Sequence, residues 1–73
     1  SRAKSIMLKQ FRESIPKGLK SGRIIWKDDL NIMAEEILDL TGKRSDFESV
    51  GITHNDIKAI LVELKGKREI ATS

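Results

Sequence analysis

The stretch SDFESVGITHNDIKAIL, residues 45–61, decides the fold that we expect for this 73-residue chain. It contains two signals for the start of a helix. Ser45 is followed three residues later by Glu48, a pattern in which the hydroxyl caps a helix and the acid returns a hydrogen bond. Thr53 and Asp56 repeat the pattern with a shorter acid, which makes a weaker box. The stretch therefore predicts two consecutive helices.

A glycine between these two helix starts predicts a sharp turn. Gly51 can adopt the positive φ that such a turn needs, and Ile52 is placed to fill the angle between the helices. We expect a short helix over about 46–50, a turn at Gly51-Ile52 and a longer helix over about 53–65.

The residues around this turn have the spacing of a known motif. Val50 precedes the turn, Thr53 caps the second helix, and Ile57 and Ile60 hold that helix against the core. With Gly51 in the turn, the pattern resembles the helix-turn-helix family. The resemblance implies a domain that binds double-stranded DNA and places its second helix in the major groove.

The residues that follow extend the resemblance to the winged-helix family, over about residues 44–72. The end of a recognition helix that leads into a β-hairpin is suggested by Leu61, Leu64, Gly66 and Ile70. Gly66 is expected to break the helix, and the chain beyond it to be extended. The resemblance implies a first short strand at Arg23–Trp26 and a wing at or near Lys65, Lys67 and Arg68.

One residue departs from the family pattern. The family usually has a small residue, often Ala, four positions before the turn glycine, where the two helices touch. This chain has Phe47 there. A large ring is expected to splay the helices and give an atypical crossing.

Two helices are expected before the motif. The first covers about residues 3–14 and is expected to end at Ile15, because Pro16 disfavours helical geometry in the residue before it. Residues 16–22 are then a loop, and Arg23–Trp26 is a short strand or an extended segment.

The second of these helices has the strongest amphipathic pattern of the chain. Asp28 or Asp29 is expected to cap it, and Gly42 to end it in the left-handed conformation. Its buried stripe is expected to consist of Leu30, Met33, Ala34, Ile37 and Leu40.

Charge is distributed in blocks along the chain. Residues 1–27 hold eight basic residues and one acidic residue, Glu13, a net charge of +7. Residues 28–41 hold five acidic residues and no basic one. Such a distribution predicts one surface that attracts phosphates and one that repels them. The alternative is that the two blocks pair with each other inside the fold.

Two groups of residues are candidates to contact nucleic acid. The candidate base contacts at the start of the 53–65 helix are Asn55, Lys58 and His54. The candidate phosphate contacts are Arg12, Lys17, Lys20, Arg23, Lys65, Lys67 and Arg68. The alternatives are an ordinary solvated helix face for the first group and a mobile solvated loop for the basic residues around Gly18 and Gly22.

Several function classes are not expected from this sequence. The chain has no cysteine and a single histidine, so neither thiolate nor histidine metal clusters are available. We find no catalytic constellation, and we expect no enzyme activity, cofactor, metal or small-molecule substrate. No apolar run approaches the ~20 residues of a membrane span, and the lack of cysteine favours an intracellular protein of cytoplasm or nucleus.

The sequence thus predicts a mainly α domain of three or four helices over residues 1–73, with a helix-turn-helix and either with or without a short β wing. Because the chain begins with Ser1, we expect it to be one domain of a longer protein. The leading hypothesis is double-stranded DNA binding as the module of a regulator or mobile element. The alternative is a helical adaptor for a partner protein or for the rest of a longer chain, suggested by Asp56, Val62 and Glu63. RNA binding through the same basic surface is a third hypothesis.

Overall fold

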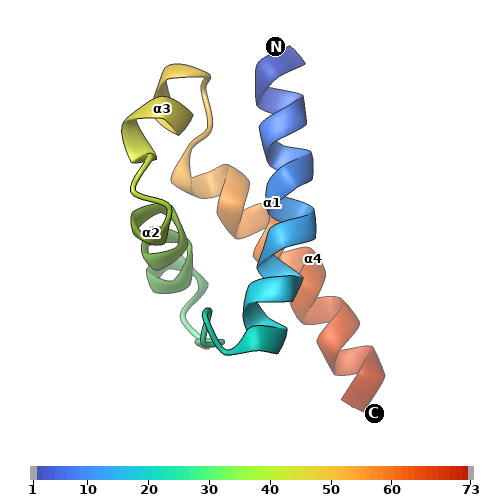
Figure 1. Cartoon of the computed structure of the whole chain (residues 1–73). Coiled ribbons are helices and arrows are strands. Elements are labelled where there is room, and N and C mark those ends of the chain that lie inside the picture. Colours follow the sequence, from blue (N-terminus) through green and yellow to red (C-terminus); the bar gives the residue numbers. More distant parts are fainter. Residues whose placement is uncertain (1, 73) are drawn as a thin grey trace.

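The computed structural model describes residues 2–72, and the side chains of residues 2–68. Its four helices are α1 (Arg2–Ser21), α2 (Leu30–Leu40), α3 (Arg44–Ser49) and α4 (His54–Thr72). The two long helices, α1 and α4, cross each other, and α2 and α3 lie to one side of them (Figure 1). The mainly α class is confirmed. No strand occurs within residues 2–72, so the winged version with a β element is not found.

The first helix is longer than predicted, since it continues through Pro16 to Ser21. The expected end at Ile15 and the expected loop over 16–22 are therefore wrong, except at Gly22, which has a φ of +82°. A proline inside a helix removes one backbone hydrogen bond. Tertiary packing offsets this loss, because Ile15 and Gly18 on either side of the proline are buried.

The segment between α1 and α2 is extended but forms no strand. Its position depends on one contact with α1, where the backbone N–H of Ile24 donates to the carbonyl of Gly18 at 3.0 Å. The side chain of Ile24 lies so close that a Cβ added to Gly18 would meet its Cδ1 at 2.5 Å. Glycine at this position thus lets the segment lie directly on the helix.

The second helix begins as predicted, with Asp29 as its N-cap. The Asp29 carboxylate accepts hydrogen bonds from the backbone N–H groups of Asn31 and Ile32 at 3.0 and 3.2 Å. Gly42, after the helix, has the expected positive φ of +66°. One position of the predicted stripe is wrong, because Leu40 is exposed whereas Leu38 is buried.

The predicted turn between the last two helices is present, with Gly51 at a φ of +87° and Ile52 fully buried. One half of the second capping signal is confirmed: the Asp56 carboxylate accepts from the backbone N–H of Thr53 at 2.8 Å. The Thr53 hydroxyl donates to the same carboxylate at 3.2 Å. The first capping signal is wrong, because α3 begins at Arg44, two residues before the predicted start, and Ser45 lies inside it.

The last helix does not break at Gly66 but continues to Thr72. The predicted extended tail is therefore wrong, and Lys65, Lys67 and Arg68 lie on a helix rather than at a wing. Glycine lowers helix stability by only about 1 kcal/mol relative to alanine. The packing of Leu64 against the core and the helix-forming residues after Gly66 are sufficient to offset a cost of that size.

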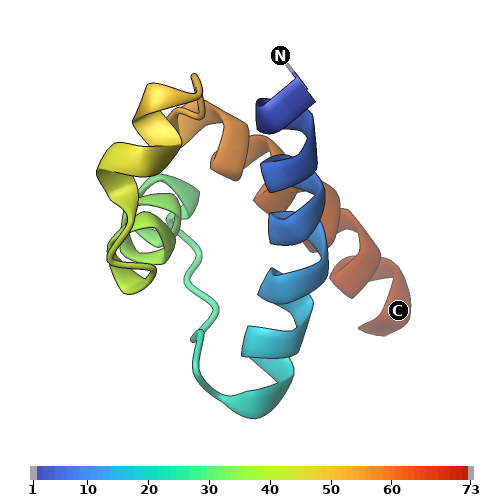
Figure 2. The same cartoon turned by 45° about the horizontal axis from the view of Figure 1, so that its top comes forward.

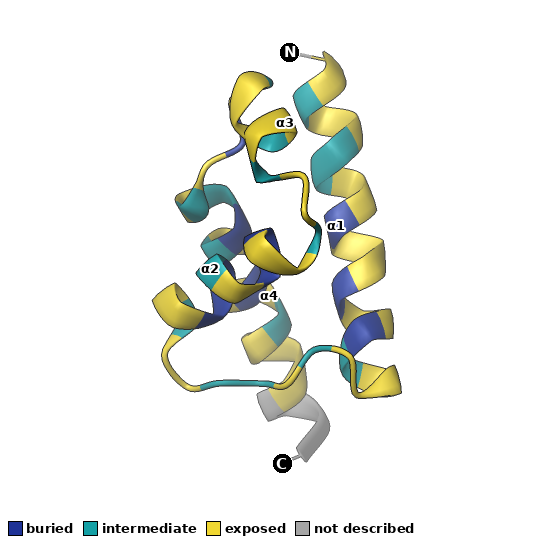
Figure 3. Ribbon diagram, turned by 60° about the vertical axis from the view of Figure 1, so that its left-hand side comes forward, coloured by how far each residue is buried: buried dark blue, intermediate teal, exposed yellow. Residues whose placement is uncertain are grey.

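The core lies where the inner sides of α1, α2 and α4 meet, as the dark blue segments of Figure 3 show. Its fully buried large side chains are Ile15, Met33, Ile52, Ile57 and Leu61. Phe47 lies against this core with its ring edge toward Phe11, at 4.9 Å between ring centroids and 63° between planes. The aromatic residue in the turn motif therefore joins α3 to α1.

Candidate nucleic-acid interface

Three of the candidate phosphate contacts converge on one groove between α1 and α4. Figures 1 and 2 both show α4 passing behind α1. The pair is bridged by Lys4 with Asp56 at 3.5 Å and, further along, by Arg12 with Glu63 at 3.9 Å. Beyond these pairs lies a groove of about 380 Å³ lined by Pro16, Leu19, Lys20, Leu64, Lys67 and Arg68. Lys20 thus lies near Lys67 and Arg68, although 47 and 48 positions separate them in the sequence. These three residues form one cationic surface, which we call the α1–α4 basic groove.

An aromatic residue contacts one of the basic residues that line this groove. The guanidinium carbon of Arg68 lies 4.6 Å from the centre of the Trp26 ring. Such a cation–π contact is worth about 0.5–1 kcal/mol at exposed sites. Trp26 is half-buried and packs against the core, so it joins the segment before α2 to the end of α4. The sequence contained no signal for this pair, because its members are far apart along the chain.

The start of α4 presents two of the three candidate base contacts outward. Asn55 is exposed and Lys58 is half-exposed. At 100° per residue, Asn55, Ala59 and Val62 share the side of α4 opposite the buried Ile57. Lys58 lies at the edge of that side toward α2, as does the exposed Lys65.

His54 takes a different place from the other two candidates. Its Nδ1 lies 2.8 Å from a carboxylate oxygen of Glu35, and its Nε2 lies 3.1 Å from the side-chain oxygen of Asn31. Both partners belong to α2. The ring therefore connects the first turn of α4 to α2, and sequence reasoning had no basis for expecting this connection.

Each carboxylate on the acidic side of α2 lies in an ion pair within the fold. Arg44, at the start of α3, forms an ion pair with Glu35, with Asp39 at 2.7 Å and with Glu48 at 3.5 Å. Its hydrogen bond to Glu35, followed by that of His54, holds the pKa of the Glu35 carboxyl below its usual value. The hydrogen bonds of Arg44 to Glu35, first, and to Asp39 raise the pKa of Arg44 itself.

The two charge blocks of the sequence do not pair with each other as a whole. Among the side chains of residues 2–68, Lys27 with Glu36 is the one ion pair that joins residues 1–27 to residues 28–41. Lys4 and Arg12 pair instead with acidic residues of α4. Most of the positive charge of the first 27 residues therefore remains on the surface.

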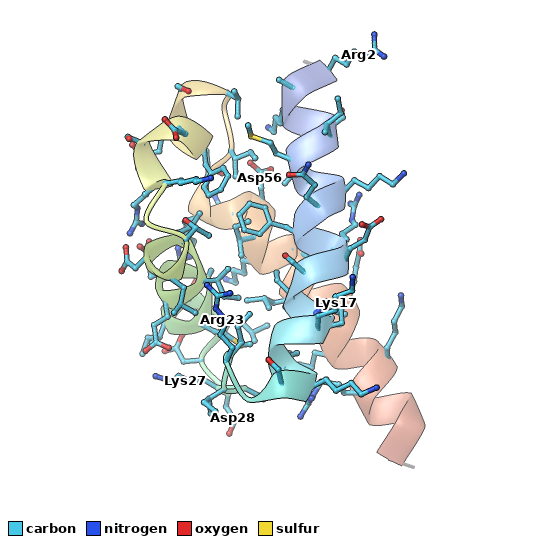
Figure 4. All side chains as sticks on the ribbon, viewed as in Figure 1. Arg2, Lys17, Arg23, Lys27, Asp28 and Asp56 are labelled. Atoms are coloured by element: carbon cyan, nitrogen blue, oxygen red, sulfur yellow. The ribbon has the colours of Figure 1, made fainter. Side chains whose placement is uncertain are left out.

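The remaining candidate phosphate contacts lie outside the α1–α4 basic groove. Lys17 and Arg23 line a separate, mostly apolar cavity between α1 and α2. Figure 4 shows Arg23 between these two helices and Lys17 on α1. The side chain of Arg12 is exposed beside Glu63. The structure thus brings Lys20, Lys67 and Arg68 together and separates them from Lys17 and Arg23.

The described residues also bear on metal binding and on membranes. No group of three or more His, Asp or Glu side chains in that part of the chain is arranged to hold a metal ion. None of its helices combines the length and the apolar character that crossing a bilayer requires. Comparison of the chain with protein-family models, curated proteins and solved structures finds no match.

Proposed function

We propose that this chain binds double-stranded DNA, with the outer side of α4 in the major groove and the α1–α4 basic groove on the phosphate backbone. One observation carries the proposal: the outward side of α4 holds Asn55 and Lys58, and the same helix ends in a cationic groove. Asparagine matches the edge of adenine, and lysine that of guanine. Basic side chains position the protein through phosphates.

The dimensions of α4 agree with this assignment. Asn55 and Lys67 are twelve residues apart on a continuous helix, which corresponds to about 18 Å of axis. The major groove is about 12 Å wide. At 100° per residue Lys67 lies about 120° round the helix from Asn55, on the side toward α1. The first turns of α4 are therefore assigned to base edges, and the α1–α4 basic groove to the backbone beside the major groove.

Neighbouring acidic residues do not oppose the approach of phosphate. Asp56 and Glu63, on the side of α4 toward α1, each lie beside a basic residue of α1. On the α2 side, Glu35 is held by Arg44 and His54. We assign base contacts to Asn55 and Lys58, and to His54 the orientation of α4 relative to α2.

The test is a fluorescence anisotropy titration of a labelled duplex at several salt concentrations. We expect binding whose logarithmic dependence on salt has a slope of about −3 or steeper, because each neutralised phosphate contributes about −0.9 and the groove holds three cations. Undetectable binding at low salt would contradict the proposal. Tighter binding to single- or double-stranded RNA of the same length would favour the RNA hypothesis instead.

A further inference from the structure

A second groove, largely apolar, lies between the C-terminal half of α1, the segment before α2 and α2 itself. It consists of two adjoining cavities of about 400 and 410 Å³. The two cavities share the residues Arg23, Ile24, Ile37 and Leu40. We call this feature the α1–α2 groove. It contributes nothing to the proposed DNA contacts of α4, so its role is a separate question.

The edges of this groove carry unusually exposed apolar side chains. Ile25 is 65% exposed and Leu40 is 47% exposed, and both line the groove. Single exposed apolar residues are common on protein surfaces, but apolar edges continuous with an apolar cavity are typical of binding surfaces. The apolar surface thus continues outward beyond the cavities, onto both edges.

The walls of the groove are held in place without an occupant. Ile24, which separates the two cavities, rests on Gly18 of α1 through the backbone hydrogen bond and the close side-chain contact described above. Ile37, on the opposite wall, belongs to the buried core. A pre-formed apolar site of this kind loses little conformational entropy when it is filled.

Three basic and two acidic residues line the groove, and the basic charge is concentrated at the first cavity. The first cavity is lined by Lys17 and Arg23 and by no carboxylate. The second cavity includes Glu36 and Asp39, but these pair with Lys27 and Arg44 respectively. No ion pair with a described carboxylate is found for Lys17 or Arg23. An occupant with negative charge next to its apolar part therefore complements the groove.

We propose that the α1–α2 groove binds an acidic amphipathic segment of another polypeptide, with two apolar side chains in the two cavities and carboxylates at Lys17 and Arg23. A small organic ligand is normally buried almost entirely in its pocket. Here the exposed edges at Ile25 and Leu40 extend beyond the cavities, which requires an occupant that covers them as well. Amphipathic peptides that place successive apolar side chains in a groove meet this requirement.

The test is a selection from a displayed library of random peptides of about 15 residues, a length that covers such grooves. We expect enriched peptides to combine two closely spaced apolar residues with Asp or Glu. A labelled synthetic copy should lose affinity at least about tenfold for Ile25→Asp and for Leu40→Asp, since each replaces a buried contact with a charge. Arg23→Gln should weaken it less and reduce the salt dependence.

A matched control is available on the same helix. Ile32 is 50% exposed, on α2 but outside the groove, so Ile32→Asp should leave peptide binding unchanged. Circular dichroism verifies the helix content of each variant. Because the groove is separate from α4, Leu40→Asp should also leave duplex binding unchanged, so failure of one proposal is distinguishable from failure of the other.

Three results would overturn the inference. The first is that no peptide is enriched, and the second is that enriched peptides bind Leu40→Asp as tightly as the original chain. The third is a different occupant. Sedimentation velocity that shows a dimer abolished by Leu40→Asp would assign the groove to a second copy, and saturable binding of decanoate alone would assign it to a small amphipathic anion.

Discussion

The acidic side of α2 and the basic surface of α1 and α4 differ in how the fold treats their charge. On α2, Glu35 and Asp39 share the guanidinium of Arg44. In the α1–α4 basic groove, by contrast, no described carboxylate is found in an ion pair with Lys20 or Lys67. Both surfaces come from runs of like charge in the sequence, but the carboxylates of α2 share cations within the fold, whereas Lys20 and Lys67 are found in no ion pair with a described carboxylate.

A charge block is therefore interpretable only when its ion-pair partners are known. Arg44, from α3, pairs with both Glu35 and Asp39, so two carboxylates of α2 share one positive charge. The acidic side keeps part of its charge, and the basic surface is the one suited to a polyanion.

The largest effect is expected from a change at the turn that orients α4, because the position of the basic surface depends on that turn. Gly51→Val should lower the free energy of unfolding by roughly 1–3 kcal/mol, because a β-branched residue is strained at positive φ. It should also weaken duplex binding, since α4 would lose its orientation. Thermal and urea unfolding measure the first effect. An unchanged melting temperature would mean that the strain at this turn is absent.

The next effect distinguishes base contacts from phosphate contacts within the basic surface. Lys58→Ala should cost about 1–2 kcal/mol on a preferred duplex and relax sequence preference, because it removes a base contact. Lys20→Ala should weaken binding to all duplexes alike and lower the salt slope by about one. Anisotropy titrations on several duplexes measure both. If Lys58→Ala leaves binding intact while Lys20→Ala abolishes it, α4 does not read bases.

A smaller effect tests whether the basic groove is built on a continuous helix. Gly66→Ala should raise the free energy of unfolding by about 0.5–1 kcal/mol, because alanine is the better helix former. Nothing lies within 4 Å of the position that the new Cβ would occupy. Urea unfolding measures the change. Destabilisation would instead mean that residue 66 does not gain from a better helix former.

The smallest effect concerns the carboxyl groups of α2 and α4 and the dependence of the fold's stability on pH. Hydrogen bonds from Arg44 and His54 lower the pKa of Glu35, and the backbone N–H of Thr53 lowers that of Asp56. A lowered pKa stabilises the fold above the ordinary carboxyl pKa of about 4, and the contribution is lost as pH falls through the lowered value. The melting temperature should therefore decrease as pH falls below about 4, the ordinary carboxyl pKa. The decrease should be smaller in Asp56→Asn than in the original chain.

The electrostatic origin of this effect is tested separately at Glu35. Arg44→Gln should raise the pKa of the Glu35 carboxyl toward its ordinary value, because the first cause of the shift is removed. An NMR titration of the carboxyl carbon measures it, with Lys9→Gln as a control that removes the same single positive charge from an exposed position of α1. A Glu35 pKa that stays equally low in Arg44→Gln would show that Arg44 is not its cause.

Local signals predicted the parts of the fold that depend on neighbouring residues. The caps at Asp29 and Thr53 and the turn at Gly51 follow from hydrogen bonds and backbone sterics within a few positions. The burial of Ile57 and Ile60 follows from helical periodicity. The same reasoning failed at Pro16 and Gly66, where a local preference against helix competes with packing that the sequence does not display.

A small helical chain, a glycine turn before α4 and a strongly basic first third follow directly from the sequence. Which charged residues pair follows from the tertiary structure. It brought Lys20 beside Lys67 and Arg68, set Arg44 against the acidic side of α2, and left the α1–α2 groove open. The physical reason is that caps and turns are made within one helical turn, whereas ion pairs and grooves depend on the crossing of helices distant in the chain.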